Sequence, residues 1–152
     1  MISLKILIAD DDFLTRMDLQ EMLTEMKHTV VGTAKNGREA LELTHKFRPD
    51  MVIMDVKMPK MDGLKAAKLI TGQKLAAVLL LTAYGDSEII KKAIDAGVVG
   101  YLTKPFSESD LSPAIQITWE RYKEFMKLKK QKVNLKEKIE EDKRIQKSYN
   151  RC

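Results

Sequence analysis

Six polar residues carry the chemistry that this sequence can be expected to perform, and each closely follows a short apolar run. They are Asp10, Asp11, Asp12, Asp55, Thr82 and Lys104. Unbroken apolar runs are typical of strands buried on both faces of a parallel sheet, and the carboxyl ends of such strands share one edge. The six residues are far apart in the sequence, but we expect them to meet at that edge.

Carboxylates gathered in one crevice repel one another, so the cluster needs protons or a cation to be stable. Hard oxygen ligands in an open cleft favour Mg²⁺. Lys104 and Thr82 would then hold an anion, the first with a fixed charge and the second with a hydroxyl donor. Mg²⁺, a lysine and a threonine around one carboxylate suit phosphoryl transfer, with the carboxylate as nucleophile and an acyl phosphate as product.

An acid after a strand can instead be the N-cap of the next helix, and for Asp12 the two interpretations are equally open. The sequence has no Gly-x-Gly-x-x-Gly loop after its first apolar run and no Gly-Lys-Ser/Thr. These absences argue against a dinucleotide site and a P-loop.

Strands and helices alternate along the first 120 residues and must position this set. The expected strands are residues 5–9, 29–33, 51–54, 77–81 and 98–102. The expected helices are residues 13–27, 37–47, 63–70, 86–96 and a last one after Pro105. Five such units with right-handed crossovers predict an α/β fold. Its doubly wound five-stranded parallel sheet has helices on both faces, and an extended C-terminal helix follows.

Two helices carry further expectations. The first carries a helical stripe of apolar residues, which consists of Leu14, Met17, Leu19, Met22, Leu23 and Met26. The last has two equally good starting points. Ser107 and Asp110 fit a capping box, whereas Ser112 fits an N-cap with Pro113 at the first helical position.

A composition boundary near residue 120 divides the chain into a body, residues 1–120, and a basic helical extension, residues 121–152. Residues 120–152 hold 12 basic and 6 acidic side chains, which leaves 15 basic and 16 acidic ones before them. Of all 152 residues, 44% are hydrophobic and 32% charged, which excludes a collagen and a wholly disordered chain.

No apolar stretch approaches the ~18 residues that span a bilayer, and the N-terminus lacks an export signal. We therefore expect a cytoplasmic protein with no membrane partner. The single cysteine, Cys152, allows no internal disulfide.

The extension is expected to be helical to about Lys147, a length of ~50 Å at 1.5 Å per residue. Its apolar residues, Phe125, Leu128, Leu135 and Ile139, follow a weak 3-4 spacing that polar residues interrupt. This favours a coiled-coil stalk that joins two copies of the chain, with a solvated or frayed helix as the alternative. Basic side chains could also contact nucleic-acid phosphates, although a mixed Lys/Glu helix is more often simply solvated.

Four segments resemble, in order and at the right spacing, the motifs of the receiver domain of two-component response regulators. They are residues 6–12 with the acidic run, 52–63 around Asp55, 80–83 around Thr82 and 100–106 around Lys104. The resemblance covers about residues 4–120 and implies the flavodoxin-like receiver fold.

The resemblance also implies the acceptor and the metal ligands. Asp55 would accept a phosphoryl group from the phosphohistidine of a sensor histidine kinase. Asp11, Asp55 and the backbone carbonyl of Lys57 would bind Mg²⁺ directly, and Asp10 would bind it through water. Lys104 would pair with the phosphoryl oxygens.

Further implied roles concern switching and lifetime. Thr82 would move to the phosphoryl group, and Tyr101 would then swing inward behind it. Lys57 and Tyr84, two residues beyond the acceptor and the switch threonine, would tune how long the phosphoryl group lasts. The peptide bond between Lys104 and Pro105 is expected to be cis.

The implied function is that of a phosphorylation-activated regulator and not of an enzyme, beyond promoting its own phosphotransfer and dephosphorylation. Its output would be partner binding or a homodimer, formed through the C-terminal helix or the face of the fourth helix, fifth strand and fifth helix. The alternatives are a Mg²⁺-dependent phosphohydrolase, which lacks a second acid at position 57, and a nucleic-acid regulator acting through the basic tail.

The receiver followed by a long helix resembles the antitermination (ANTAR-type) class of regulators. Residues 135–145 resemble the entry to the helical RNA-binding bundle of that class, but its remaining helices do not follow. Either the chain is truncated or it is a receiver with only a dimerisation stalk. RNA is an expected partner only if an output bundle is present.

Overall fold

The computed structural model describes residues 2–83 and 87–149, with 129–149 described as helix backbone. The chain divides into two compact units, Met1–Trp119 and Glu120–Cys152. Tyr84, Cys152 and the side chains of Leu135 and Ile139 lie outside the described residues, so the predictions for them stay predictions. No described helix has the length and apolar character needed to cross a membrane.

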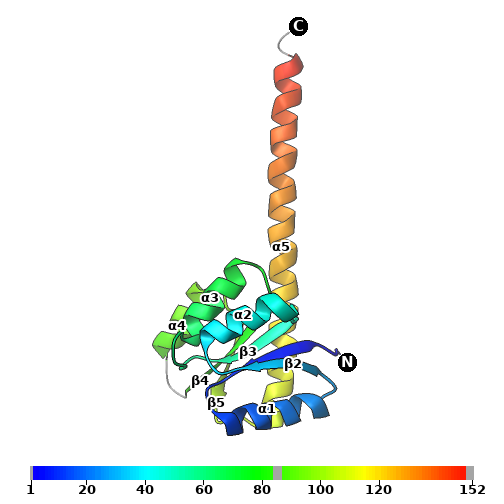
Figure 1. The fold of residues 1–152 in the computed structure, drawn as a ribbon. Helices are drawn as coiled ribbons and strands as arrows, with labels where there is room; N and C mark the ends of the chain where they lie inside the picture. The colour runs from blue at the N-terminus through cyan, green and yellow to red at the C-terminus, as the bar shows by residue number, and fades with distance from the viewer. Residues whose placement is uncertain (1, 84–86, 150–152) are drawn as a thin grey trace. The chain divides into compact units, whose positions relative to one another are not determined.

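Five parallel strands form one sheet in the order β2-β1-β3-β4-β5. The strands are β1 (Lys5–Ala9), β2 (Thr29–Ala34), β3 (Met51–Asp55), β4 (Ala77–Ala83) and β5 (Gly100–Lys104). The helices are α1 (Phe13–Glu25), α2 (Gly37–Phe47), α3 (Gly63–Gly72), α4 (Ser87–Asp95) and α5 (Glu108–Tyr149). In Figure 1, α2, α3 and α4 lie on one face of the sheet, and α1 and the start of α5 lie on the other. The predicted doubly wound fold is confirmed.

The three central strands are apolar because helices cover both of their faces. Residues 6–9 of β1 and 51–54 of β3 are fully buried, and so are most of those of β4. The edge strands β2 and β5 contain partly exposed residues. This difference explains why the central strands are unbroken apolar runs.

Short polar side chains begin three of the helices. Asp12, Asn36 and Asp62 are the N-caps of α1, α2 and α3, and each accepts a hydrogen bond from the backbone N–H three residues further on. These bonds satisfy amide groups that have no partner within the helix. The capping interpretation of Asp12 is therefore confirmed.

Two residues of the apolar stripe in α1 lie outside the core. Leu14 and Met17 are 66% and 52% exposed. The face that packs on the sheet consists instead of Arg16, Leu19 and Leu23, which also follow a 3-4 spacing. Since α1 has apolar residues on two faces, periodicity alone could not identify the buried one.

Two predicted boundaries near the end of the receiver unit also change. Strand β5 begins at Gly100 and not at Val98, because the backbone N–H groups of Gly97 and Val98 bond to carbonyls of α4 and close that helix. Helix α5 begins after Ser107, whose N–H and hydroxyl both contact the Asp110 carboxylate. The start at Ser112 is therefore wrong, and Pro113 lies inside the helix.

Candidate functional site

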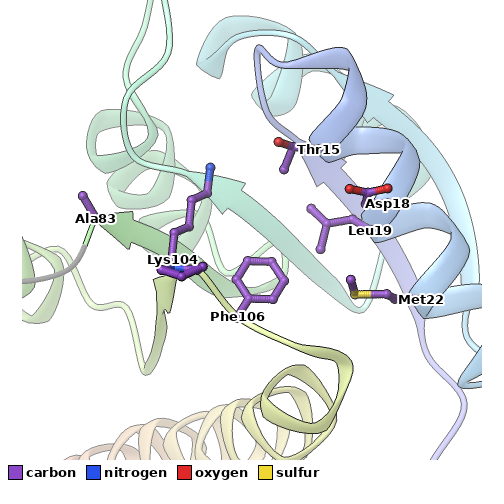
Figure 2. A pocket seen from close by; sticks show the side chains of 8 residues that line it. Thr15, Asp18, Leu19, Met22, Ala83, Lys104 and Phe106 are labelled. Atoms are coloured by element: carbon purple, nitrogen blue, oxygen red, sulfur yellow. The ribbon is translucent and has the colours of Figure 1, made fainter.

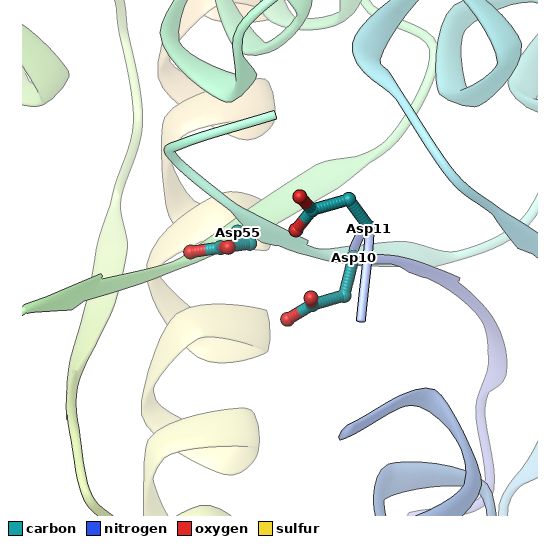
Figure 3. Close-up of side chains that lie close together, drawn as sticks. All are labelled: Asp10, Asp11 and Asp55. Atoms are coloured by element: carbon teal, nitrogen blue, oxygen red, sulfur yellow. The ribbon is translucent and has the colours of Figure 1, made fainter. Parts of the chain in front are cut away.

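Three carboxylates meet at the carboxyl edge of the sheet. Asp10 follows β1 and Asp55 ends β3, and these strands are neighbours with Ala9 opposite Met54. One oxygen from each of Asp10, Asp11 and Asp55 lies within 4.8 Å of the others. Figure 3 shows the three side chains gathered at the ends of the two strands. Parallel pairing therefore brings together acids that are 45 residues apart in the sequence.

Lys104 reaches this cluster from β5, which is an edge strand of the sheet. Its Nζ lies 3.1 Å from Oδ2 of Asp10 and 3.5 Å from Oδ1 of Asp55. Lys104 ends β5, which is separated from β3 by β4, so its side chain extends past the end of β4. One cation thus contacts two of the three acids.

The environment shifts the pKa values of both members of the Lys104–Asp55 pair. Burial raises the pKa of Asp55, the nearby charges of Asp10 and Asp11 raise it further, and Lys104 only partly opposes this effect. Burial alone would lower the pKa of Lys104, but its bond to Asp10 and the charge of Asp55 outweigh burial and raise it. Three carboxylates share this site with one lysine, so the formal charge of the cluster is net negative.

Asp10 is held rigidly from several sides. Its side chain is 1% exposed, and its Oδ1 accepts a hydrogen bond of 2.9 Å from the N–H of Asp12. Nη1 of the buried Arg16 donates to the Asp10 carbonyl at 2.6 Å. Arg16 was not among the predicted site residues, although its spacing of three and seven residues from Leu19 and Leu23 places it on the same buried face of α1.

The predicted switch residues take two distinct environments. Thr82 is 1% exposed, and among the described residues its hydroxyl has no hydrogen-bond partner. Tyr101 is 47% exposed on the edge strand β5. Burying a hydroxyl without a partner is costly, and an acceptor oxygen placed beside the Thr82 hydroxyl would remove that cost.

Two hollows flank the acidic cluster. One of about 600 Å³ is lined by Asp11, Lys57 and Lys92 among others. The other, of about 460 Å³, lies between α1 and the segment after β5. Figure 2 shows its walls, with Lys104 and Phe106 facing the α1 residues Thr15, Asp18, Leu19 and Met22.

The predicted cis peptide bond between Lys104 and Pro105 is confirmed. All of the described predicted site residues lie at or beside the same sheet edge except Tyr101, which is set back on β5. The donor set is made of carboxylate oxygens, which hard divalent cations prefer. The Asp10, Asp11 and Asp55 side chains could therefore hold one metal ion between them.

Comparisons with known proteins agree with this geometry. Residues 6–116 match the family described as response regulator receiver domain. The chain is 44% identical over 144 residues to the transcriptional regulatory protein PdtaR of Mycobacterium tuberculosis, covering 95% of this chain and 70% of PdtaR.

Solved structures show the same fold. A response regulator receiver domain protein of Clostridium thermocellum is 31% identical with a TM-score of 0.73, covering 82% of this chain and 99% of that one. The CheX–CheY–BeF3–Mg complex of Borrelia burgdorferi gives 26% identity and a TM-score of 0.69, covering 73% and 85% of the two chains. The chain therefore belongs to the response regulator receiver family of two-component systems.

Proposed function

We propose that Asp55 accepts a phosphoryl group from a sensor histidine kinase, with Mg²⁺ bound by the acidic cluster. The observation that carries this proposal is the contact of Lys104 with both Asp10 and Asp55 in a cluster that has a net negative charge. An Asp55 oxygen would attack phosphorus, and the bond from phosphorus to the kinase histidine would break. Lys104 would hold the phosphoryl oxygens as charge develops on them.

Mg²⁺ fits this site because it binds through one or two carboxylates and keeps several waters. Asp11 and Asp55 would be direct ligands together with the backbone carbonyl of Lys57, and Asp10 would bind through water. When bound, the ion neutralises charge on the acids and on the incoming phosphoryl group. The Borrelia burgdorferi complex contains Mg²⁺ and BeF3 together with CheX and CheY, which supports the same choice of ion here.

A labelling experiment tests the acceptor. Wild-type protein incubated with Mg²⁺ and acetyl phosphate should gain one phosphoryl group, measured by intact mass, and Asp55→Asn should gain none. Asp50→Asn is a matched control, since Asp50 precedes the same strand at its opposite end and bonds to the Lys5 N–H. Retained labelling of Asp55→Asn refutes the assignment. Many turnovers on a general phosphate ester, measured separately, would favour a phosphohydrolase instead.

The switch would follow from Thr82, whose hydroxyl has no hydrogen-bond partner among the residues that the structure describes. A phosphoryl group adds three strong acceptor oxygens, and a bond to Thr82 would satisfy that hydroxyl. Movement of Thr82 would free space behind it for Tyr101, which is now half exposed. Lys57 and Tyr84 would set the lifetime of the phosphoryl group by controlling how water reaches it.

The output would be association of two copies or binding of a separate partner in transcriptional control. Three apolar side chains are well exposed on the elements α4, β5 and α5: Ile94 at 63%, Tyr101 at 47% and Ile117 at 49%. Their exposure supports a docking role for the surface that these three elements form. The basic segment 121–152 is the second proposed dimer contact. The similarity to PdtaR, a transcriptional regulatory protein, supports control of transcription, by antitermination if an RNA-binding bundle is present.

Light scattering with Mg²⁺ and beryllofluoride tests the output. A monomer that becomes a dimer in the wild type but not in Asp55→Asn supports phosphorylation-driven association. A constant mass contradicts it.

A further inference from the structure

We propose that Gly37, at the start of α2, is a positioning residue for the metal site. It acts through the loop that leads from β3 to α3, residues 56–62, which begins immediately after Asp55. This inference rests on the proposed function, since it takes Mg²⁺ as the ion that the cluster binds.

The loop is short and is fixed at both ends by hydrogen bonds to glycine amides. At its base, the N–H of Gly63 donates to the carbonyl of Val56 at 2.8 Å. At its outer end, the N–H of Gly37 donates to the carbonyl of Met61 at 2.8 Å. The second bond comes from a different helix, so α2 holds the loop from outside.

The outer end of the loop contains a turn that needs such support. The N–H of Met61 donates to the carbonyl of Pro59 at 2.8 Å, and Lys60 between them has φ of 66°. This left-handed backbone is unfavourable for a residue with a side chain. Since the same Met61 supplies the carbonyl that Gly37 binds, the contact with α2 stabilises the turn.

Only glycine allows this contact. A Cβ built at position 37 would lie 2.8 Å from the Met61 carbonyl carbon, 2.9 Å from the Asp62 carbonyl oxygen and closer still to the Met61 oxygen. All are backbone atoms and cannot rotate away. An alanine at this position must therefore displace the loop or the first turn of α2, which Asn36 anchors by accepting from the Glu39 N–H at 2.8 Å.

A displaced loop would disturb the metal ligands. The loop joins Asp55 directly and carries the Lys57 carbonyl, and Val56 and Met58 are packed in the core, so little slack is available. Mg²⁺ requires near-ideal octahedral geometry, whereas Ca²⁺ accepts irregular sites with longer bonds. A shift of the loop should therefore weaken Mg²⁺ binding more than Ca²⁺ binding.

Calorimetric titration of the full chain with Mg²⁺ and with Ca²⁺ tests the inference. Gly37→Ala should raise the Kd for Mg²⁺ by about tenfold, as changes around metal ligands commonly do, and should raise the Kd for Ca²⁺ much less. Gly72→Ala is the matched control, because a Cβ there meets no atom within 4 Å. It should leave both constants unchanged.

Each other result decides the question. An unchanged Mg²⁺ constant, or an equal loss for both ions, overturns the positioning role of Gly37 while leaving the proposed function intact. Wild-type protein that binds neither ion overturns the proposed function and this inference with it. If Gly37→Ala does not fold, Asn36→Ala should lower the preference for Mg²⁺ over Ca²⁺ by loosening α2, and an unchanged preference overturns the inference.

Discussion

Replacing Thr82 by valine should stabilise the protein and, under the proposed function, should disable the phosphorylation switch. Thr82 is buried, and its hydroxyl has no hydrogen-bond partner among the described residues. Burying such a group costs roughly 1–3 kcal/mol, and valine removes the hydroxyl without shortening the side chain. For a unit of about 120 residues, each 1 kcal/mol corresponds to a rise in Tm of about 4 °C. We therefore expect Thr82→Val to melt about 4 °C or more above the wild type.

Thermal melting with and without Mg²⁺ and beryllofluoride measures both effects. The phosphoryl mimic should stabilise the wild type partly through its new bond to Thr82, and Thr82→Val should lose that part of the stabilisation. Thr44→Val is the matched control, because Thr44 is equally buried but its hydroxyl donates to the Ala40 carbonyl at 2.6 Å. It should be neutral or destabilising. The reasoning is refuted if Thr82→Val melts below the wild type, or if it responds to beryllofluoride as the wild type does.

Two further predictions concern pH and charge. Burial raises the pKa of Asp55, so ionisation of this carboxyl lowers the stability of the fold as pH rises from about 3.8 through the raised pKa. Asp55→Asn should therefore melt above the wild type at pH 7 without Mg²⁺. An equal or lower Tm contradicts this prediction. His28 is part-buried and its Nδ1 accepts from the Leu4 N–H at 3.0 Å, and burial lowers its pKa. The stability of the fold should therefore fall as pH drops below about 6.5. Urea unfolding from pH 7.5 to 5 should show a smaller loss of stability in His28→Gln than in the wild type. An identical pH profile for the variant would rule out His28 as the cause.

The sequence was sufficient to predict the site because its residues lie at strand ends. Asp10, Asp55, Thr82 and Lys104 each close an apolar run, and parallel pairing places all such positions on one edge whatever the exact register. The expected clustering of Asp10, Asp11 and Asp55 is confirmed by the structure. The roles of these residues in phosphoryl transfer remain predictions.

The buried face of α1 could not be predicted from the sequence in this way. Leu14 and Met17 occupy a second apolar face of α1, and only the packing of Arg16, Leu19 and Leu23 shows which face is buried. The choice depends on tertiary contacts that helical periodicity does not contain.

The contact between α2 and the loop after β3 could not be predicted from the sequence either. It joins the backbone N–H of Gly37 to the backbone carbonyl of Met61, and main-chain groups are the same in every residue. A glycine near a helix start is also common for local reasons. Only the close approach of the two backbones distinguishes Gly37 from Gly72.

The contact of Lys104 with Asp10 and Asp55 has a consequence for protein synthesis. The lysine enters the site from the last strand of the sheet, so 94 residues separate it from Asp10. A nascent chain that has exposed β1 and β3 already has its three acids but lacks the cation that contacts two of them. Under the proposed function, the chain should become able to accept a phosphoryl group only after β5 has left the ribosome and joined the sheet.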